Sequence, residues 1–247
     1  MSLLRSDQST LTTDQWNLIS NLIHCYDEYS GIVIGNGFMK EQNNLPLKMR
    51  FKSKAVIGLV QILSGACQSL YKNNRDFRLL PSKNRSILLD RTFTVMETLS
   101  TNFIMYQIRL LDQPGYYDAV GVMSHPSVVP AARLLRDRLD LDRIVMKLFL
   151  AILSFSTLSC TIYVKIPTIN LSNIKEILRI QDTYIELAWR YLMYRYDYKE
   201  TVRCFSNLIR AVFATHSGLF QSMNMEWYIN MIDSIIQQTK QTVVLSD

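Results

Sequence analysis

The feature that most constrains this chain is the scarcity of residues that interrupt regular structure. Its 247 residues include only 8 glycines and 6 prolines. Long uninterrupted elements are therefore expected, whereas an all-β sandwich or a Gly-rich phosphate-binding fold would need more chain breakers. A hydrophobic fraction of 48%, with 19% charged residues, indicates a sizeable core and excludes a disordered chain.

Apolar residues recur at helical spacing along most of the chain. The segment Leu47–Tyr71 is apolar on two faces, so it is expected to be one long helix inside the domain. A loop rich in Gly, Asn and Lys is expected between Gly31 and Pro46. Candidate capping residues are Thr12 or Thr13, Ser82, Asp140 and Ser172. The expected helices are 14–30, 47–71, a short one from 82, then 92–111, 130–139, 141–155, 172–192, 198–220 and 225–239.

One segment breaks the helical pattern. Tyr116–Met123 is aromatic and β-branched and follows a Pro114-Gly115 turn, which predicts a small β-hairpin. No repeat or linker divides the chain. The sequence thus predicts a single all-α domain over residues 1–247 with ten to twelve helices, and residues 1–10 are expected to be disordered.

Charge and cysteine content narrow the function classes. The net charge of +6 is mild and has no run of five cations, so no direct nucleic-acid contact is expected. The four cysteines are far apart and form no C-x-x-C pair, which disfavours a zinc site and a disulfide framework and suits an intracellular protein. They are Cys25, Cys67, Cys160 and Cys204.

A membrane span is the alternative interpretation of one apolar stretch. Leu148–Val164 carries no charge, but it is shorter than the ~20 apolar residues of a span and holds five Ser and Thr residues. A buried central helix followed by a turn is the preferred interpretation, so no membrane partner is expected.

No catalytic motif is present in the sequence. His24, His125 and His216 form no metal-binding pattern, and no nucleophile elbow, Walker loop or dinucleotide fingerprint occurs. Neither an enzyme activity nor a metal or other cofactor is expected.

The stretch Leu70–Leu89, LYKNNRDFRLLPSKNRSILL, resembles the signature of nuclear receptor ligand-binding domains. Lys72, Phe77, Leu80, Leu88 and Leu89 stand at the signature's positions, while Asn84 and Arg85 replace its Asp-Gln. The segments LTTDQWNLISNLIHCYDEY, KLFLAILSFS, IKEILRIQDTYIELAWRYLMYRY and RCFSNLIRAVFATHSGLF resemble the family's first, eighth, ninth and tenth helices, so the likeness covers nearly the whole chain.

The resemblance implies a fold and a function. The fold is a three-layer antiparallel helical sandwich with a small hairpin. The function is that of a nuclear regulator of transcription (or one that shuttles from the cytoplasm) that binds a lipophilic, lipid-like or steroid-like molecule. A core filled by its own side chains is the alternative. The pocket residues implied are Val56, Ile57, Val60, Leu63, Glu97, Thr98, Thr101 and Ile104.

Two further surfaces follow from the resemblance. A groove for an LxxLL or corepressor helix would be lined by Lys72, Gln68, Arg85 and Leu89, with Lys72 and Arg85 making a positive rim. A homo- or heterodimer with another nuclear receptor would use Phe205, Leu208, Ile209 and Val212, a stripe that Phe213 extends.

The chain also departs from the family. The two four-cysteine zinc sites of the family's DNA-binding module are not in this sequence. The activation helix, with its central Glu, is not recognisable, although WYINMI has the pattern with Asn230 in place of Glu. Two alternatives therefore stay open: a ligand-independent dimerisation and corepressor module on the same fold, and an unrelated helical enzyme or membrane-associated protein.

Overall fold

The computed structural model describes residues 11–157, 171–222 and 225–244, and within these ranges the chain forms helices and no strand. The all-α prediction is confirmed. The α-helices are α1 (Thr13–Cys25), α2 (Glu28–Asn44), α3 (Ser53–Leu63), α4 (Gln68–Asn73), α5 (Arg75–Arg78), α6 (Ser82–Gln107), α7 (Pro114–Met123), α8 (Val128–Arg136), α9 (Arg143–Ser154), α10 (Ile174–Arg195), α11 (Tyr198–Gln221) and α12 (Glu226–Val244). Short 3-10 turns occupy Leu47–Met49 (η2) and Leu110–Asp112 (η3).

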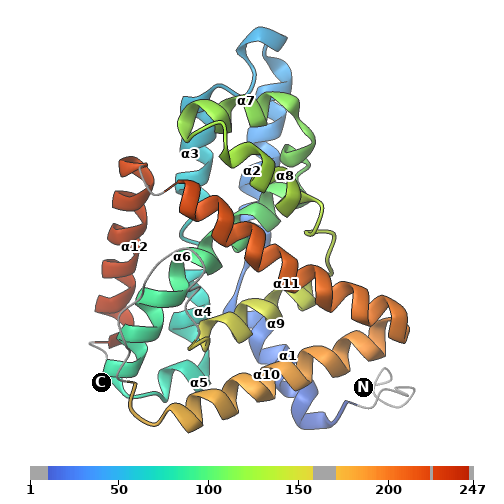
Figure 1. Cartoon of the computed structure of the whole chain (residues 1–247), viewed down its shortest axis with the longest axis vertical. Coiled ribbons are helices and arrows are strands. Elements are labelled where there is room, and N and C mark those ends of the chain that lie inside the picture. The colour runs from blue at the N-terminus through green and yellow to red at the C-terminus, as the bar shows by residue number, and fades with distance from the viewer. Residues whose placement is uncertain (1–10, 158–170, 223–224, 245–247) are drawn as a thin grey trace.

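Helix α6 is the centre of the molecule. It packs against α2, α3, α9, α11 and α12, and more than half of its 26 residues are buried. In Figure 1 it runs behind α11, with α12 along one side. The sequence predicted two helices here, a short one from Ser82 and another to Leu111. The chain instead forms one helix, because no residue between Ser82 and Gln107 breaks it, and it ends before Arg109 with φ 60°.

The predicted hairpin is wrong, because Pro114–Met123 is helix α7. Pro114 stands in its first turn, where a missing N–H costs nothing. Tyr116, Tyr117, Ala119 and Val120 are the buried residues, and their spacing is that of one helical face packed on α3 and α8. The β-propensity of the aromatic and branched residues was overridden by this burial.

The predicted loop from Gly31 to Pro46 is also wrong, because most of it lies in helix α2, capped by Asp27. Its glycines permit close packing. A Cβ at Gly31 would stand 2.8 Å from Ile104 Cδ1, and one at Gly35 would stand 2.6 Å from Ile108 Cδ1. Glycine thus brings α2 onto the end of α6, where a larger residue would clash.

The single helix predicted for Leu47–Tyr71 is divided into η2, α3 and α4. Phe51, with φ 51°, turns the chain into α3, and a tight turn at residues 64–67 separates α3 from α4. The expectation of complete burial fails at the start of the segment and on the outer face of α3, since Leu47 is 80% and Ile62 60% exposed. Val56, Leu59, Val60 and Leu63 form the buried face.

Three predicted caps shift by one or two residues. Helix α6 follows Pro81 without a side-chain cap, and Ser82 is its first residue. Helix α9 is capped by Asp142, which accepts from the amides of Ile144 and Val145, rather than by Asp140. Helix α10 begins after Asn173 in the left-handed conformation, and Ser172 instead exchanges hydrogen bonds with Asn84. This exchange ties the start of α10 to the start of α6.

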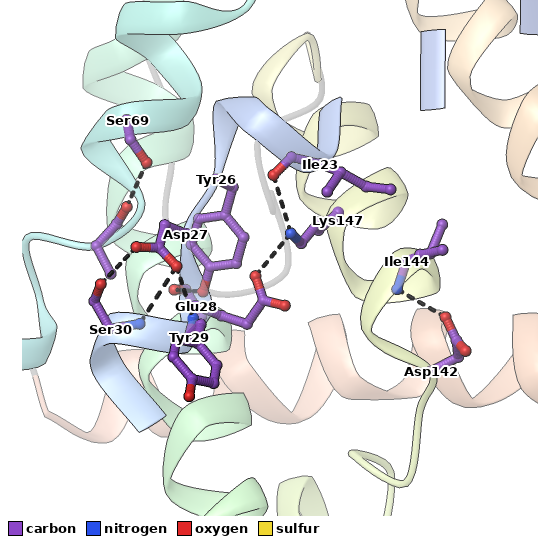
Figure 2. Close-up of polar contacts among 12 residues, drawn as sticks. Ile23, Tyr26, Asp27, Glu28, Tyr29, Ser30, Ser69, Asp142, Ile144 and Lys147 are labelled. Carbon is purple, nitrogen blue, oxygen red and sulfur yellow. Dashed lines mark hydrogen bonds and ion pairs between the residues drawn. The ribbon is translucent and has the colours of Figure 1, made fainter. Parts of the chain in front are cut away.

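A buried ion pair joins the corner between α1 and α2 to α9 (Figure 2). Lys147 Nζ lies 2.8 Å from Glu28 Oε2 and donates to the carbonyl of Ile23 at 3.2 Å, and both charged side chains are only 7% exposed. The ammonium also lies 5.9 Å from the centre of the Tyr26 ring. Tyr26 in turn shares a 2.6 Å hydrogen bond with Ser100 of α6.

The apolar segment that resembles a membrane span is divided as well. Its first part belongs to α9, which is almost entirely buried in the protein core, and residues 158–164 lie outside the described residues. In the ranges that the structure describes, no helix has both the length and the apolar character needed to cross a bilayer.

Candidate functional site

A cavity of about 130 Å³ lies among the α6, α7, α8, α11 and α12 helices, with one residue contributed by α3. Its wall is mostly apolar. The lining residues are Val60, Glu97, Thr98, Thr101, Asn102, Met105, Tyr116, Val120, Met123, Ser124, Val128, Ala131, Ala132, Leu135, Ala214, Thr215, Gly218, Leu219, Ser222, Met225, Trp227 and Tyr228. The space exists because the residues of α8 and α11 that face it are small. The side chains of Ala131 and Ala214 end at Cβ, and Gly218 has no side chain.

One wall of the cavity carries a buried carboxyl group, Glu97, held by hydroxyl groups. Ser64 and Thr101 lie 2.7 and 3.0 Å from Oε1, and Tyr228 Oη lies 2.6 Å from Oε2. The residue is 1% exposed, and within the described part of the chain no salt bridge pairs it with a cation. This hydroxyl-held carboxyl is the polar centre of an otherwise apolar cavity.

The hydrogen atoms in this network favour a neutral carboxyl. Ser64 also lies 2.7 Å from the carbonyl of Val60, while Thr98 lies 2.9 Å from Tyr228 and 2.8 Å from the carbonyl of Thr94. Together with the three contacts of Glu97, these make six short contacts that only four hydroxyl hydrogens can serve. A proton on Glu97 supplies a fifth hydrogen. Glu97 can then donate to Tyr228, Tyr228 to Thr98, and Thr98 to the carbonyl of Thr94.

The electrostatics agree with this count. Burial raises the pKa of Glu97 above its ordinary value, and the hydroxyl donors only partly offset this effect. Burial and the neighbouring Glu97 likewise raise the pKa of Tyr228 well above its usual range. The pair can therefore offer both a hydroxyl donor and an acceptor to a molecule in the cavity, without a fixed charge to neutralise.

Half of the predicted pocket residues line this cavity. Val60, Glu97, Thr98 and Thr101 do so, whereas Val56, Leu63 and Ile104 are buried in the core outside it and the half-buried Ile57 is not in its wall. The sequence analysis missed Trp227 and Tyr228 of α12. Its one signal was WYINMI, which it considered only as a degenerate activation motif.

The predicted coregulator residues lie on two helices that are both covered by α12. Gln68 and Lys72 belong to α4, and Lys72 Nζ donates to Gln68 Oε1 at 2.8 Å. Helix α12 packs against α4 and α6, and its Lys240 pairs with Asp90 at 2.7 Å. The face expected to be an open groove thus carries the chain's own C-terminal helix.

Arg85 is not the rim cation that was expected. It is 4% exposed and donates from Nη1 to the carbonyls of Arg78 and Leu80, so it ties α6 to the turn before it. Leu89 is completely buried. The positive rim proposed from the sequence is therefore reduced to Lys72, because Arg85 faces backbone acceptors in the interior.

The predicted dimer stripe on α11 is partly internal. Leu208 is 1% exposed and belongs to the core, and Phe205 and Val212 are half-buried. Ile209 and Phe213 are 46% and 51% exposed, and Val202 lies on the same face with 42%. The outward stripe of α11 is therefore Val202, Ile209 and Phe213 rather than the set centred on Leu208.

Among the described residues, the remaining cysteine and histidine side chains form no second site. Cys25, Cys67 and Cys204 are buried and free, while Cys160 lies outside the described residues. His24 and His125 are exposed, and burial lowers the pKa of His216. Across the described ranges, no three His, Cys, Asp or Glu side chains are grouped so as to hold a metal ion.

Comparison with known proteins found no protein-family model and no curated protein that matches this chain.

Proposed function

We propose that this chain is a regulatory ligand-binding domain of the nuclear-receptor type, with the three-layer antiparallel sandwich of that family. It binds a small, largely apolar molecule with one polar group and acts in the nucleus by recruiting coregulators. The observation that carries the proposal is the cavity. Four residues assigned to the pocket by resemblance lie in its wall, among them a buried Glu97.

The size of the cavity limits the ligand. A cavity of about 150 Å³ accommodates a benzene molecule, and this one measures about 130 Å³. The space therefore suits one ring or a short aliphatic chain, and a whole steroid would need the helices to separate. The hydroxyl-held carboxyl favours a ligand with a hydroxyl group, which can accept from the protonated Glu97 Oε2 or donate to Tyr228 Oη.

Helix α12 links the cavity to the coregulator face. Trp227 and Tyr228, at its start, line the cavity, and its later turns cover α4 and α6. A ligand that displaces Tyr228 from Glu97 would change the free energy of docking α12. Since a ligand shifts a conformational equilibrium only through contacts that differ between two states, this contact is the coupling element.

The test uses two probes of nearly equal shape, p-cresol and p-xylene, with binding measured by ligand-observed NMR. p-Cresol should bind roughly five- to tenfold more tightly, the effect of a hydrogen bond worth about 1 kcal/mol. Ala132→Phe, which fills the cavity, should abolish binding of both, and Ala132→Ser is the matched control. Equal affinity of the two probes, or no binding of either, would contradict the proposal.

The second candidate is a ligand-independent dimerisation and corepressor module on the same fold. The exposed stripe Val202, Ile209 and Phe213 and the small cavity favour it. Native mass spectrometry of the purified chain separates the two functions. A dimer with no bound small molecule, combined with failure of the p-cresol test, would select this candidate.

A further inference from the structure

The turn between α2 and α3 forms one extremity of the molecule, at the upper end of the long axis in Figure 1. Its tip exposes aliphatic side chains. Leu47 is 80%, Met49 57% and Leu45 37% exposed, within five residues of one another. Single exposed aliphatics are ordinary, but three at one protruding tip are a surface feature that needs a partner.

The same tip concentrates the positive charge of the chain. Residues 40–54 hold five cations and one acid, a net charge of +4 out of +6 for the whole protein. Within that segment Lys40, Lys48, Lys52 and Lys54 are exposed. The α3 helix begins beside them at Ser53 without a side-chain cap, and its free amides add to the local positive potential.

The aliphatic tip is held in place by its base. Arg50 donates from Nε and Nη2 to the carbonyls of Leu45 and Asn43 at 2.8 and 2.7 Å. The amide of Phe51 donates to the side chain of Gln42 at 2.7 Å, and the Phe51 ring is buried against Gly115. The turn η2 therefore presents Leu47 and Met49 outward as a fixed projection.

We infer that this tip docks on the surface of an anionic lipid membrane. Leu47 and Met49 would enter the boundary between headgroups and acyl chains, while the four lysines contact lipid phosphates and carboxylates. The sequence-based expectation of no membrane partner rested on the lack of a span, which adsorption does not require. The inference is independent of the proposed function.

The observations favour lipid over nucleic acid. Proteins that bind single-stranded nucleic acid stack bases on exposed aromatic rings. The one aromatic residue within residues 40–54 is Phe51, which is 5% exposed. Aliphatic side chains flanked by lysines suit an interface that is apolar below and negatively charged above.

The experiment measures cosedimentation of the full chain with vesicles of phosphatidylcholine alone and of phosphatidylcholine mixed with phosphatidylserine. Binding should require phosphatidylserine and should fall as salt is raised. Lys48→Ala with Lys52→Ala should weaken it more than tenfold, since each cation near an anionic surface contributes about 1 kcal/mol. Leu47→Glu with Met49→Glu should abolish it.

Matched controls use equally exposed residues elsewhere. Leu79→Glu changes a leucine that is 72% exposed after α5, near the lower end of Figure 1, and Lys175→Ala with Lys199→Ala removes two exposed cations of α10 and α11. These variants should bind like the wild type, and circular dichroism should show every variant folded. No binding by the wild type, equal binding to both vesicles, unchanged binding of the tip variants, or binding to RNA in place of vesicles would overturn the inference.

Discussion

At the scale of single residues, Glu97 decides the chemistry of the cavity. Its contacts with Ser64, Thr101 and Tyr228 leave a carboxyl group in the interior with hydroxyl partners only. A neutral carboxyl gives this network five hydrogen atoms for its six contacts, whereas an ionised one leaves two contacts without a hydrogen atom. The protonation state therefore links the stability of the fold to pH.

Glu97→Gln should remove part of the pH dependence of stability. Because the pKa of Glu97 is raised by burial, the native state holds the proton more tightly than the unfolded chain. Wild-type stability should thus be greatest below the ordinary glutamate value of about 4.3 and fall as pH rises through the native pKa. The Gln variant, whose amide can donate to Tyr228, should lack this fall and should be the more stable protein at pH 8.

Urea denaturation of both proteins at several pH values gives the measurement. Glu97→Leu is the control for shape, because it leaves three hydroxyls without their hydrogen-bond partner and should lose about 2–4 kcal/mol. A Gln variant that is less stable than the wild type at alkaline pH would indicate an ionised Glu97.

The buried ion pair of Glu28 and Lys147 permits a second prediction at this scale. Lys147→Ala should lower the free energy of unfolding by about 3–5 kcal/mol, because it leaves a buried carboxylate unpaired. Replacing both residues, Glu28→Leu with Lys147→Met, should recover most of that loss. Arg203→Ala, which breaks an exposed pair with Glu200, should leave the stability nearly unchanged. Chemical denaturation decides between these outcomes, and an additive double mutant would contradict the pairing argument.

At the scale of elements, α12 covers the face that the proposed function assigns to coregulators. Its buried residues Ile232 and Ile236 face the protein, and Lys240 fixes its far end to Asp90. If the proposed function holds, an LxxLL or corepressor peptide must compete with α12 for α4 and α6.

Ile232→Asp with Ile236→Asp should loosen α12 and increase the affinity for such a peptide, measured by fluorescence anisotropy. Adding Lys72→Ala should reduce that gain by roughly 1–2 kcal/mol, the value of charge-assisted hydrogen bonds to the peptide. The exposed Ile229→Asp is the matched control, since Ile229 is 39% exposed and should leave α12 docked. A peptide that binds the wild type as tightly as the double variant would place its site elsewhere.

Helix α11 offers an independent test of self-association. Ile209→Arg with Phe213→Arg should give a folded monomer, because both side chains lie on the exposed face. Leu208→Arg should instead unfold the chain, since it would bury a charge in the core. Sedimentation velocity distinguishes these results, and a monomeric wild type at high concentration would refute the dimer.

At the scale of the whole molecule, α6 contacts helices from both ends of the chain, including α2 and α12. We expect one cooperative unfolding transition. Far-UV circular dichroism and the fluorescence of Trp16, Trp189 and Trp227, which lie on α1, α10 and α12, should give coincident melting curves. Phe103→Ala in α6 should shift both curves equally, and separate transitions would show that the helices unfold as independent units.

The sequence by itself determined the all-α class and the main amphipathic helices. The period of apolar residues defined α10 and α11 nearly to their ends, because burial of one helical face is a local pattern. Glu97, Thr98 and Thr101 were expected in a pocket because of the resemblance to nuclear receptor ligand-binding domains, and they line the cavity.

Only the tertiary structure decided the rest, because it depends on contacts between residues far apart in sequence. Gly31 and Gly35 lie in helix α2, where Ile104 and Ile108 pack closely against them. Tyr116–Met123 is helical and is covered by α3 and α8. Tyr228 reaches Glu97 across 131 residues of chain. No spacing rule links two positions so far apart in the sequence. The sequence pattern therefore could not predict that α12 closes the cavity and covers the face expected to bind coregulators.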